Sequence, residues 1–409
     1  MPRARLAKRL LPFYVAVFLQ GFILWYAVEK LFMHRIGFDD AGIGFMVAFY
    51  SAIMLLVETP SGVLADRWSR RGVLVVASVL LAASSVVGGV SHGVPLYLVA
   101  AALWGIFFAL YSGAYDSILY DTLLEEVGGG EAYGRYYGYV KVVDSVALVL
   151  GSLLGGWISS KFGIREAFFW TVPVALAAIG ALALFQEPVL HKASAHLSVR
   201  QQVRTTFRAV GQKGQLRLVL AVLVVMSATS YTLYEFGQLW WIALAFPVLA
   251  FGPANAVLLS TIGVGGAAAA KLNMHRYVPM QCTVLAMVAA ALGLVVWRNG
   301  VGNVVLQSVI GVGTIGLCVV FNKFLHDSLP SQVRAGASSA VSSLTRIVMI
   351  PFSLLFGFVS RQLDVFRATW LFVVPLLVAV VLIYKLFGGR HELEPVDAAD
   401  EATTQVYQK

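Results

Sequence analysis

Acidic and basic side chains interrupt several long apolar segments of this sequence, where each could bind or transfer a charge. Asp116 and Asp144 lie in apolar segments of the first half, and Glu235 lies in an aromatic segment of the second half. Arg346 lies about twelve residues into a further apolar run. A charged side chain at the centre of a membrane helix costs about 2.5–3.5 kcal/mol, so such residues normally line a cavity or form pairs. They predict sites for proton exchange, ion pairing or a bound solute.

Three carboxylates are candidates for proton exchange. Asp116 follows Tyr111 and Tyr115 in a polar and aromatic segment, which fits a cavity wall better than a lipid-facing surface. A carboxylate withdrawn from water can exchange a proton near neutral pH. We expect Asp116 to carry the exchange, followed by Glu235 and Asp144. A hydrogen-bonded structural role for Asp116 is the alternative.

Three basic residues also lie within the apolar segments. Lys141 and Asp144 are three residues apart, so they share a helix face and are expected to neutralise each other. The helical rise places Arg346 about 18 Å from the inner end of its segment. Its guanidinium could hold an anionic solute or neutralise a buried carboxylate. Glu29 and Lys30 lie near the outer end of the first segment and are expected to reach water.

Aromatic and amide side chains accompany the charges and could contact an organic solute. The segment around Glu235 holds two tyrosines and a glutamine, and aromatic rings attract organic cations. Trp240 and Trp241 follow, and an interfacial aromatic belt explains them equally well. The candidates for substrate binding are Arg346, Gln20, Tyr111, Tyr115, Tyr231, Tyr234 and Gln238.

The composition places these residues in a polytopic membrane protein. Of 409 residues, 59% are hydrophobic and 12% are charged, whereas about 25% of a soluble domain is charged. A span of about 20 residues with its loop allows roughly twelve spans. The apolar runs predict helices near 10–33, 42–62, 72–91, 95–121, 135–160, 165–186, 216–246, 250–270, 279–297, 301–325, 334–361 and 365–388.

The distribution of positive charge predicts the orientation. With the N-terminus inside, 21 Lys and Arg lie on the cytoplasmic side and six on the other, while three lie within spans, which accounts for all 30. Both termini are therefore expected in the cytoplasm. The division is an N-terminal six-helix half (1–186), a basic cytoplasmic loop (187–215), a C-terminal six-helix half (216–388) and a disordered acidic cytoplasmic tail (389–409).

A charged loop between the second and third spans carries the clearest motif. It reads Gly-Val-Leu-Ala-Asp-Arg-Trp-Ser-Arg-Arg from Gly62 to Arg71. At this position it resembles the signature loop of the major facilitator superfamily, and more particularly of twelve-helix members like the drug–proton antiporters. The resemblance implies an all-α integral membrane fold of 12 transmembrane helices in two pseudo-symmetric six-helix halves.

The same resemblance implies a role for the loop in gating. It places Asp66 against the eleventh helix, where a helix N-terminus favours an anion, and pairs Arg70 with Asp121. The expected cytoplasmic latch holds the two halves together and comprises Gly62, Asp66, Arg67, Arg70, Arg71 and Asp121. The alternative is that the arginines only fix the topology.

A glycine-rich stretch on the fifth span resembles a motif of superfamily antiporters. Gly151, Gly155 and Gly156 occupy its glycine positions, although Ser152 replaces the proline. The match suggests antiport. Packing of helices against small residues is the alternative. The fourth span has no arginine near its start, so coupling by that group of drug antiporters is excluded.

These features together predict a secondary active transporter that works by alternating access. Proton-coupled efflux of an amphipathic organic compound is expected first, and uptake of a polar or anionic solute by symport or uniport is the alternative. A polytopic membrane enzyme or sensor is the alternative of a different class.

No ATP-binding loop or metal-ligand cluster occurs in the sequence, so we expect no enzyme activity, cofactor or metal. A net charge of +9 reflects the inner loops rather than nucleic acid. We expect a monomer in the lipid of a bacterial cytoplasmic membrane.

Overall fold

A computed structural model describes residues 2–67, 69–127, 133–188, 214–329, 331–388 and 391–392. Side chains are not described for 2–5, 59–67, 127, 134 and 331–340. The described chain is almost entirely helical. Most of the loop and tail expected at 187–215 and 389–409 lies outside the described residues.

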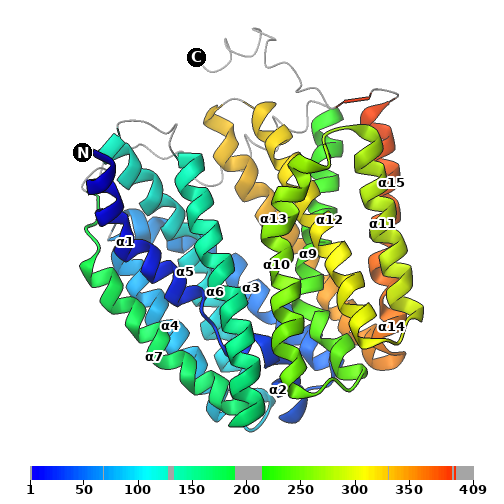
Figure 1. The fold of residues 1–409 in the computed structure, drawn as a ribbon, viewed down its shortest axis with the longest axis horizontal. Coiled ribbons are helices and arrows are strands. Elements are labelled where there is room, and N and C mark those ends of the chain that lie inside the picture. Colours follow the sequence, from blue (N-terminus) through cyan, green and yellow to red (C-terminus); the bar gives the residue numbers. More distant parts are fainter. Residues whose placement is uncertain are drawn as a thin grey trace.

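The helices form two groups, which lie side by side in Figure 1. The first group comprises α1 (Pro2–Gly21), the 3-10 helix η1 (Trp25–Val28), α2 (Glu29–Arg35), α3 (Asp40–Arg67), α4 (Arg70–Val90), α5 (Val94–Val127), α6 (Tyr133–Lys161) and α7 (Ile164–Leu184). The second comprises α9 (Gly214–Ala243), α10 (Val248–Lys271), α11 (Tyr277–Val296), α12 (Gly300–Asp327), α13 (Ser331–Gln362), α14 (Val365–Ala368) and α15 (Trp370–Phe387).

Twelve helical segments of the described residues are long and apolar enough to cross a membrane. Each corresponds to one apolar run of the sequence, so the prediction of an all-α membrane protein with twelve spans is confirmed. Large apolar side chains stay exposed along these helices, among them Leu56, Trp157 and Val301. Such surfaces suit contact with lipid rather than with water.

The first span is broken, which the sequence did not indicate. α1 ends at Gly21, and the chain continues through η1 into α2. Gly155 of α6 packs against the carbonyl of Leu24, and the Leu24 amide donates to the Thr171 hydroxyl at 3.2 Å. Thr171 of α7 therefore satisfies one backbone amide that the break releases, as a break within a membrane requires.

The two groups converge on the side of α2 and diverge toward the ends where α1 begins and α15 ends (Figure 1). On the α2 side, α6 approaches α10 so closely that a Cβ on Gly156 would lie 2.5 Å from the Gly252 Cα. α3 meets α13 there, where Arg361 pairs with Asp39 at 3.1 Å. The halves are thus joined by the first residues of α3 and α10 and by the last residues of α6 and α13.

Candidate functional site

A cavity of about 440 Å³ lies between the two groups of helices. Its wall combines aromatic and aliphatic side chains with a few polar ones. The first group contributes Gln20, Gly21, Ile23, Tyr26, Tyr50, Met54, Trp104, Phe107, Phe108, Tyr111, Ser112, Tyr115, Lys141, Asp144, Ser145 and Leu148. The second group contributes Tyr231, Tyr234, Glu235, Leu259 and Ile262. Both halves therefore form one site.

Aromatic residues of α5 form a continuous stack along one side of the cavity. The Tyr111 ring lies 5.6 Å from the Phe107 ring and 5.0 Å from the Tyr115 ring, with both pairs nearly parallel. Trp104 continues the stack, 5.1 Å from Phe107. Spacings of three and four residues put these rings on one helix face. The result is a flat apolar wall that suits an organic ring system.

A charged cluster on α5 and α6 lies beside this wall. Lys141 donates to the Tyr115 hydroxyl and lies 5.0 Å from the centre of the Tyr115 ring. The Tyr111 hydroxyl donates to Asp144 at 3.4 Å. The positive charge of Lys141 acts on both Asp144 and Asp116. One lysine therefore serves two carboxylates.

This arrangement differs from the pairing expected within α6. Among the described side chains, no ion pair within 4.0 Å joins Lys141 to Asp144, because Lys141 extends toward α5 instead. Asp144 lines the cavity, whereas Asp116 is absent from the described wall. Oδ1 of Asp116 is buried and accepts no hydrogen bond from the described residues.

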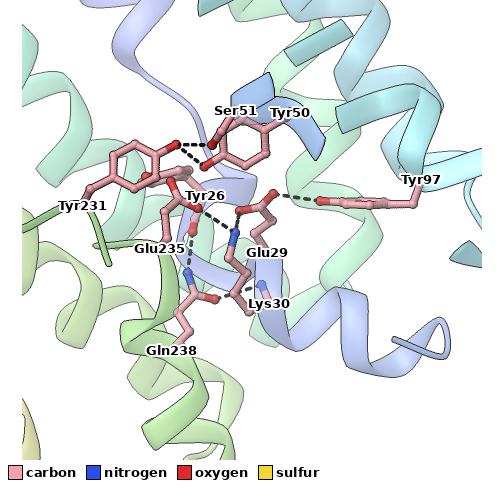
Figure 2. Close-up of polar contacts among 9 residues, drawn as sticks. All are labelled: Tyr26, Glu29, Lys30, Tyr50, Ser51, Tyr97, Tyr231, Glu235 and Gln238. Atoms are coloured by element: carbon pink, nitrogen blue, oxygen red, sulfur yellow. Dashed lines mark hydrogen bonds and ion pairs between the residues drawn. The ribbon is translucent and has the colours of Figure 1, made fainter. Parts of the chain in front are cut away.

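A second charged cluster joins the two halves on the α2 side, and Figure 2 shows it. The Lys30 ammonium lies 2.6 Å from Glu29 Oε2 and 3.2 Å from Glu235 Oε2. The Tyr97 hydroxyl donates to Glu29 Oε1 at 3.1 Å. The expectation that Glu29 and Lys30 reach water is wrong, since their residues are only 7% and 2% exposed. After the break in the first span, Lys30 reaches Glu235 of α9 and Glu29 accepts from Tyr97 of α5 instead.

Hydrogen bonds around this cluster also cross between the halves (Figure 2). The Lys30 amide donates to Gln238 Oε1 at 3.1 Å, and Gln238 Nε2 donates to the Tyr26 carbonyl at 2.8 Å. Gln238 thus bridges η1, α2 and α9, and it is absent from the described cavity wall. The Tyr231 hydroxyl donates to the Tyr50 hydroxyl at 2.8 Å.

Arg346 and Gln20 take different positions relative to the cavity. Arg346 Nε lies 3.4 Å from Glu58 Oε2, and a terminal nitrogen of Arg346 contacts Met54 Sδ at 3.3 Å. Met54 lines the cavity, whereas Arg346 is absent from the described wall. Gln20 lines the cavity and donates to the Leu74 carbonyl at 3.1 Å and to the Ser78 hydroxyl at 2.8 Å.

The expected latch is described in part. Arg70 and Asp121 form an ion pair, and Arg70 donates to the Ser117 carbonyl at 3.2 Å. This pair links α4 to α5 within the first group of helices, so the expectation that it holds the two halves together is wrong for this conformation. Arg71 donates to the Phe185 carbonyl, beyond the end of α7, at 3.1 Å. The side chains of Gly62, Asp66 and Arg67 lie outside the described part.

The glycines expected to pack the fifth span all meet close neighbours. A Cβ on Gly151 would lie 3.2 Å from the Ile23 amide nitrogen, and one on Gly155 would overlap the Leu24 carbonyl. Gly156 faces Gly252 of the other half. These residues therefore support both the break in the first span and the contact between the halves.

The sequence profile of the Major Facilitator Superfamily matches residues 10–353. The chain belongs to this superfamily of membrane transporters, as the resemblance of its loop predicted. Its twelve candidate spans fit an integral membrane protein.

Relatives with described roles match parts of the chain. Multidrug resistance protein 2 of Bacillus subtilis is 22% identical over 210 residues, which is 50% of this chain and 51% of that protein. Quinolone resistance protein NorA of Staphylococcus aureus is 20% identical over 231 residues, which is 56% of this chain and 58% of NorA. The chain thus spans little more than half the length of these relatives.

Solved transporter structures match nearly the whole chain. The nucleoside transporter NupG has a TM-score of 0.70 at 14% identity, covering 92% of this chain and 98% of that chain. A D-xylose-proton symporter has the same TM-score and identity, with coverage of 92% and 98%. A bacterial homologue of the lysosomal transporter Spinster has a TM-score of 0.70 at 13% identity, covering 97% and 100%. At these identities the likeness shows the fold alone.

Proposed function

We propose that this transporter exports an amphipathic organic compound in exchange for protons. The observation that carries the proposal is the cavity, whose apolar and aromatic wall includes the carboxylates of Asp144 and Glu235. Such a wall suits an organic ring system that also carries a polar or charged group. The multidrug and quinolone resistance proteins among the relatives support export rather than uptake.

Transport would proceed by alternating access of the two halves, 1–186 and 216–388, about the cavity. The halves meet on the α2 side and diverge toward the chain ends (Figure 1). If both termini lie in the cytoplasm, as the positive charges indicate, this conformation loads its substrate from the cytoplasm. Asp66, near the end of α3 and shortly before Arg70 of the Arg70–Asp121 pair in the first half, would help to close that side in the other conformation.

Asp144 is the proton-coupling residue that the geometry favours. It faces the cavity and accepts a hydrogen bond from Tyr111, so a proton that enters the cavity can reach it. Asp116 lies behind the wall and shares the positive charge of Lys141 with Asp144. We therefore place Asp144 before Asp116 and Glu235 as the site of exchange.

Uptake of an anionic solute anchored by Arg346 is less well supported. The guanidinium is paired with Glu58 and is absent from the described cavity wall. An anion would first have to displace the Glu58 carboxylate, since both would compete for one positive charge. The described cavity wall presents two carboxylates against the single ammonium of Lys141, which disfavours anions.

Everted membrane vesicles with an acidic interior and a pH-sensitive dye test the proposal. Adding an exported compound should release protons from the vesicles and restore the dye fluorescence. Asp144→Asn should reduce this recovery to the level of vesicles without the transporter, because asparagine cannot carry the proton. Asp327→Asn is the matched control, since Asp327 is exposed and pairs with Lys323 at 2.9 Å.

The panel should contain organic cations, anions and neutral compounds. Full recovery with Asp144→Asn would move the proton site to Asp116 or Glu235. The uptake alternative would replace export if two results were obtained together. No compound would restore the dye fluorescence, and whole cells would accumulate anions with the wild type but not with Arg346→Gln.

A further inference from the structure

Lys30 is shared unequally between the two halves. Its ammonium lies 2.6 Å from Glu29, the adjacent residue on α2, and 3.2 Å from Glu235 on α9 (Figure 2). Glu29 and Lys30 begin the same short helix, so they move together. Any separation of the halves on the α2 side must break the contact between Lys30 and Glu235 and can preserve the contact between Lys30 and Glu29.

The cluster holds more negative than positive charge. The side chains of Glu29, Lys30 and Glu235 are 9%, 2% and 11% exposed. With all three ionised, two carboxylates face one ammonium, and an excess charge withdrawn from water is costly. Among the described residues, the titratable groups that interact with Glu235 are Tyr26, Tyr50, Tyr97 and Tyr231; Tyr234 lines the same cavity, Lys141 lines it on the side of α5 and α6, and Arg346 lies near Tyr231. Both of these cations have other partners, since Lys141 donates to Tyr115 and Arg346 pairs with Glu58.

Glu235 is the member of the cluster that faces the cavity. It lines the wall together with Tyr26, Tyr50, Tyr231 and Tyr234, four of the six tyrosines there, whereas Glu29 and Lys30 are absent from the described wall. The faces of tyrosine rings attract a cation, and more strongly where the cation is withdrawn from water. The four rings belong to both halves. A solute in the cavity therefore meets a carboxylate, aromatic rings and an excess negative charge at one place.

We propose that Lys30 is a tethered counter-cation for Glu235, which a positively charged organic substrate displaces when it binds. This inference rests on the proposed export function and deepens it, because it makes the substrate cationic. On displacement Lys30 stays with Glu29, and the substrate takes its place at Glu235. The charge contact between α2 and α9 is then lost, so binding loosens the α2 side, where the cavity must open for release.

Binding of tetraphenylphosphonium to the purified transporter tests the competition without transport. Measured by titration calorimetry at pH 8, Lys30→Met should bind this cation at least about tenfold more tightly than the wild type, because the competitor is gone. Glu235→Gln should bind it at least about tenfold more weakly, since Glu29 and Lys30 then neutralise each other. Substitution of a merely structural lysine would not tighten binding.

Glu29→Gln separates competition from direct contact with the ligand. Glu29 is absent from the described cavity wall, yet its loss leaves Lys30 with Glu235 alone. Binding should therefore weaken, although no group that touches the ligand has changed. Lys323→Met is the matched control, because Lys323 is exposed and pairs with Asp327, and it should bind like the wild type. Binding of neutral triphenylphosphine oxide should be the same in all these variants.

The opening of the α2 side has its own measurement. Spin labels replacing the exposed Phe162 and Leu363 report the distance between the halves there, once Cys282 and Cys318 are replaced by serine. Tetraphenylphosphonium should lengthen this distance in the wild type, and Lys30→Met should lengthen it without the cation.

The outcomes distinguish this inference from the proposed function. Unchanged or weaker binding by a folded Lys30→Met variant would overturn the competition, and so would unchanged binding by Glu29→Gln if Lys30→Met does not fold. An unchanged distance in the presence of bound cation would overturn the coupling to opening. If the variants bind tetraphenylphosphonium in the expected order of affinity but the vesicles show no proton-coupled export, the competition stands and only the export function is overturned.

Discussion

Replacing Gly155 with alanine is expected to abolish the folded transporter. A Cβ at this position would overlap the carbonyl oxygen of Leu24, at the break between α1 and η1. That carbonyl belongs to the backbone, and the Leu24 amide is already held by Thr171 at 3.2 Å. Overpacking in a filled interior costs about 1–3 kcal/mol and more where backbone must move. The yield of monodisperse protein and its melting temperature measure the effect.

Gly138→Ala is the matched control on the same helix. A Cβ on Gly138 of α6 would meet nothing within 4 Å, and alanine favours a helix over glycine by about 0.8–1.0 kcal/mol. This variant should be at least as stable as the wild type. Equal stability of Gly155→Ala and Gly138→Ala would mean that the break in the first span does not depend on this close approach.

The spans and the superfamily could be predicted because both signals are local. An apolar run of about 20 residues indicates a span wherever its neighbours lie, and Gly62 to Arg71 form one continuous motif. Twelve runs became twelve candidate spans, and the family resemblance is confirmed. Neither inference needed a tertiary contact.

The break in the first span could not be predicted, because its causes are distant in sequence. Gly155 and Thr171 lie more than a hundred residues from Leu24, and both meet it only after folding. An apolar run looks the same whether the helix continues or breaks. The same limit explains the wrong expectation for Lys30, whose partner Glu235 lies 205 positions away.

Within the site, the sequence indicated several of the residue types that line the cavity. It did not indicate which side chains contact one another. Spacing on one helix face suggested that Lys141 pairs with Asp144, but Lys141 reaches Tyr115 on the neighbouring helix. Tyr26 and Tyr50 line the cavity without any motif to indicate them. Their positions follow from the packing of η1 and α3 between the halves, which one sequence does not encode as a local pattern.

Arg70→Met is expected to lower the rate of export by about an order of magnitude while leaving inserted protein in the membrane. Arg70 is paired with Asp121, which is only 5% exposed. Breaking a buried pair costs about 3–5 kcal/mol. If one conformation loses about 1.4 kcal/mol more than the other when the pair is broken, the ratio of the two populations changes tenfold. Initial rates in vesicles, normalised to inserted protein and taken well below its melting temperature, measure the effect.

Arg135→Met is the control, because Arg135 is exposed and lies on the same side as Arg70. If the arginines only fix topology, the loss of one of 21 inner charges changes little, and Arg70→Met should export like Arg135→Met. A latch instead requires opposite charges on α4 and α5. The double variant Arg70→Asp with Asp121→Arg should then recover part of the rate that either single variant loses. Recovery through exchanged charges depends on the pair itself, which distinguishes a role of the ion pair from a role in topology alone.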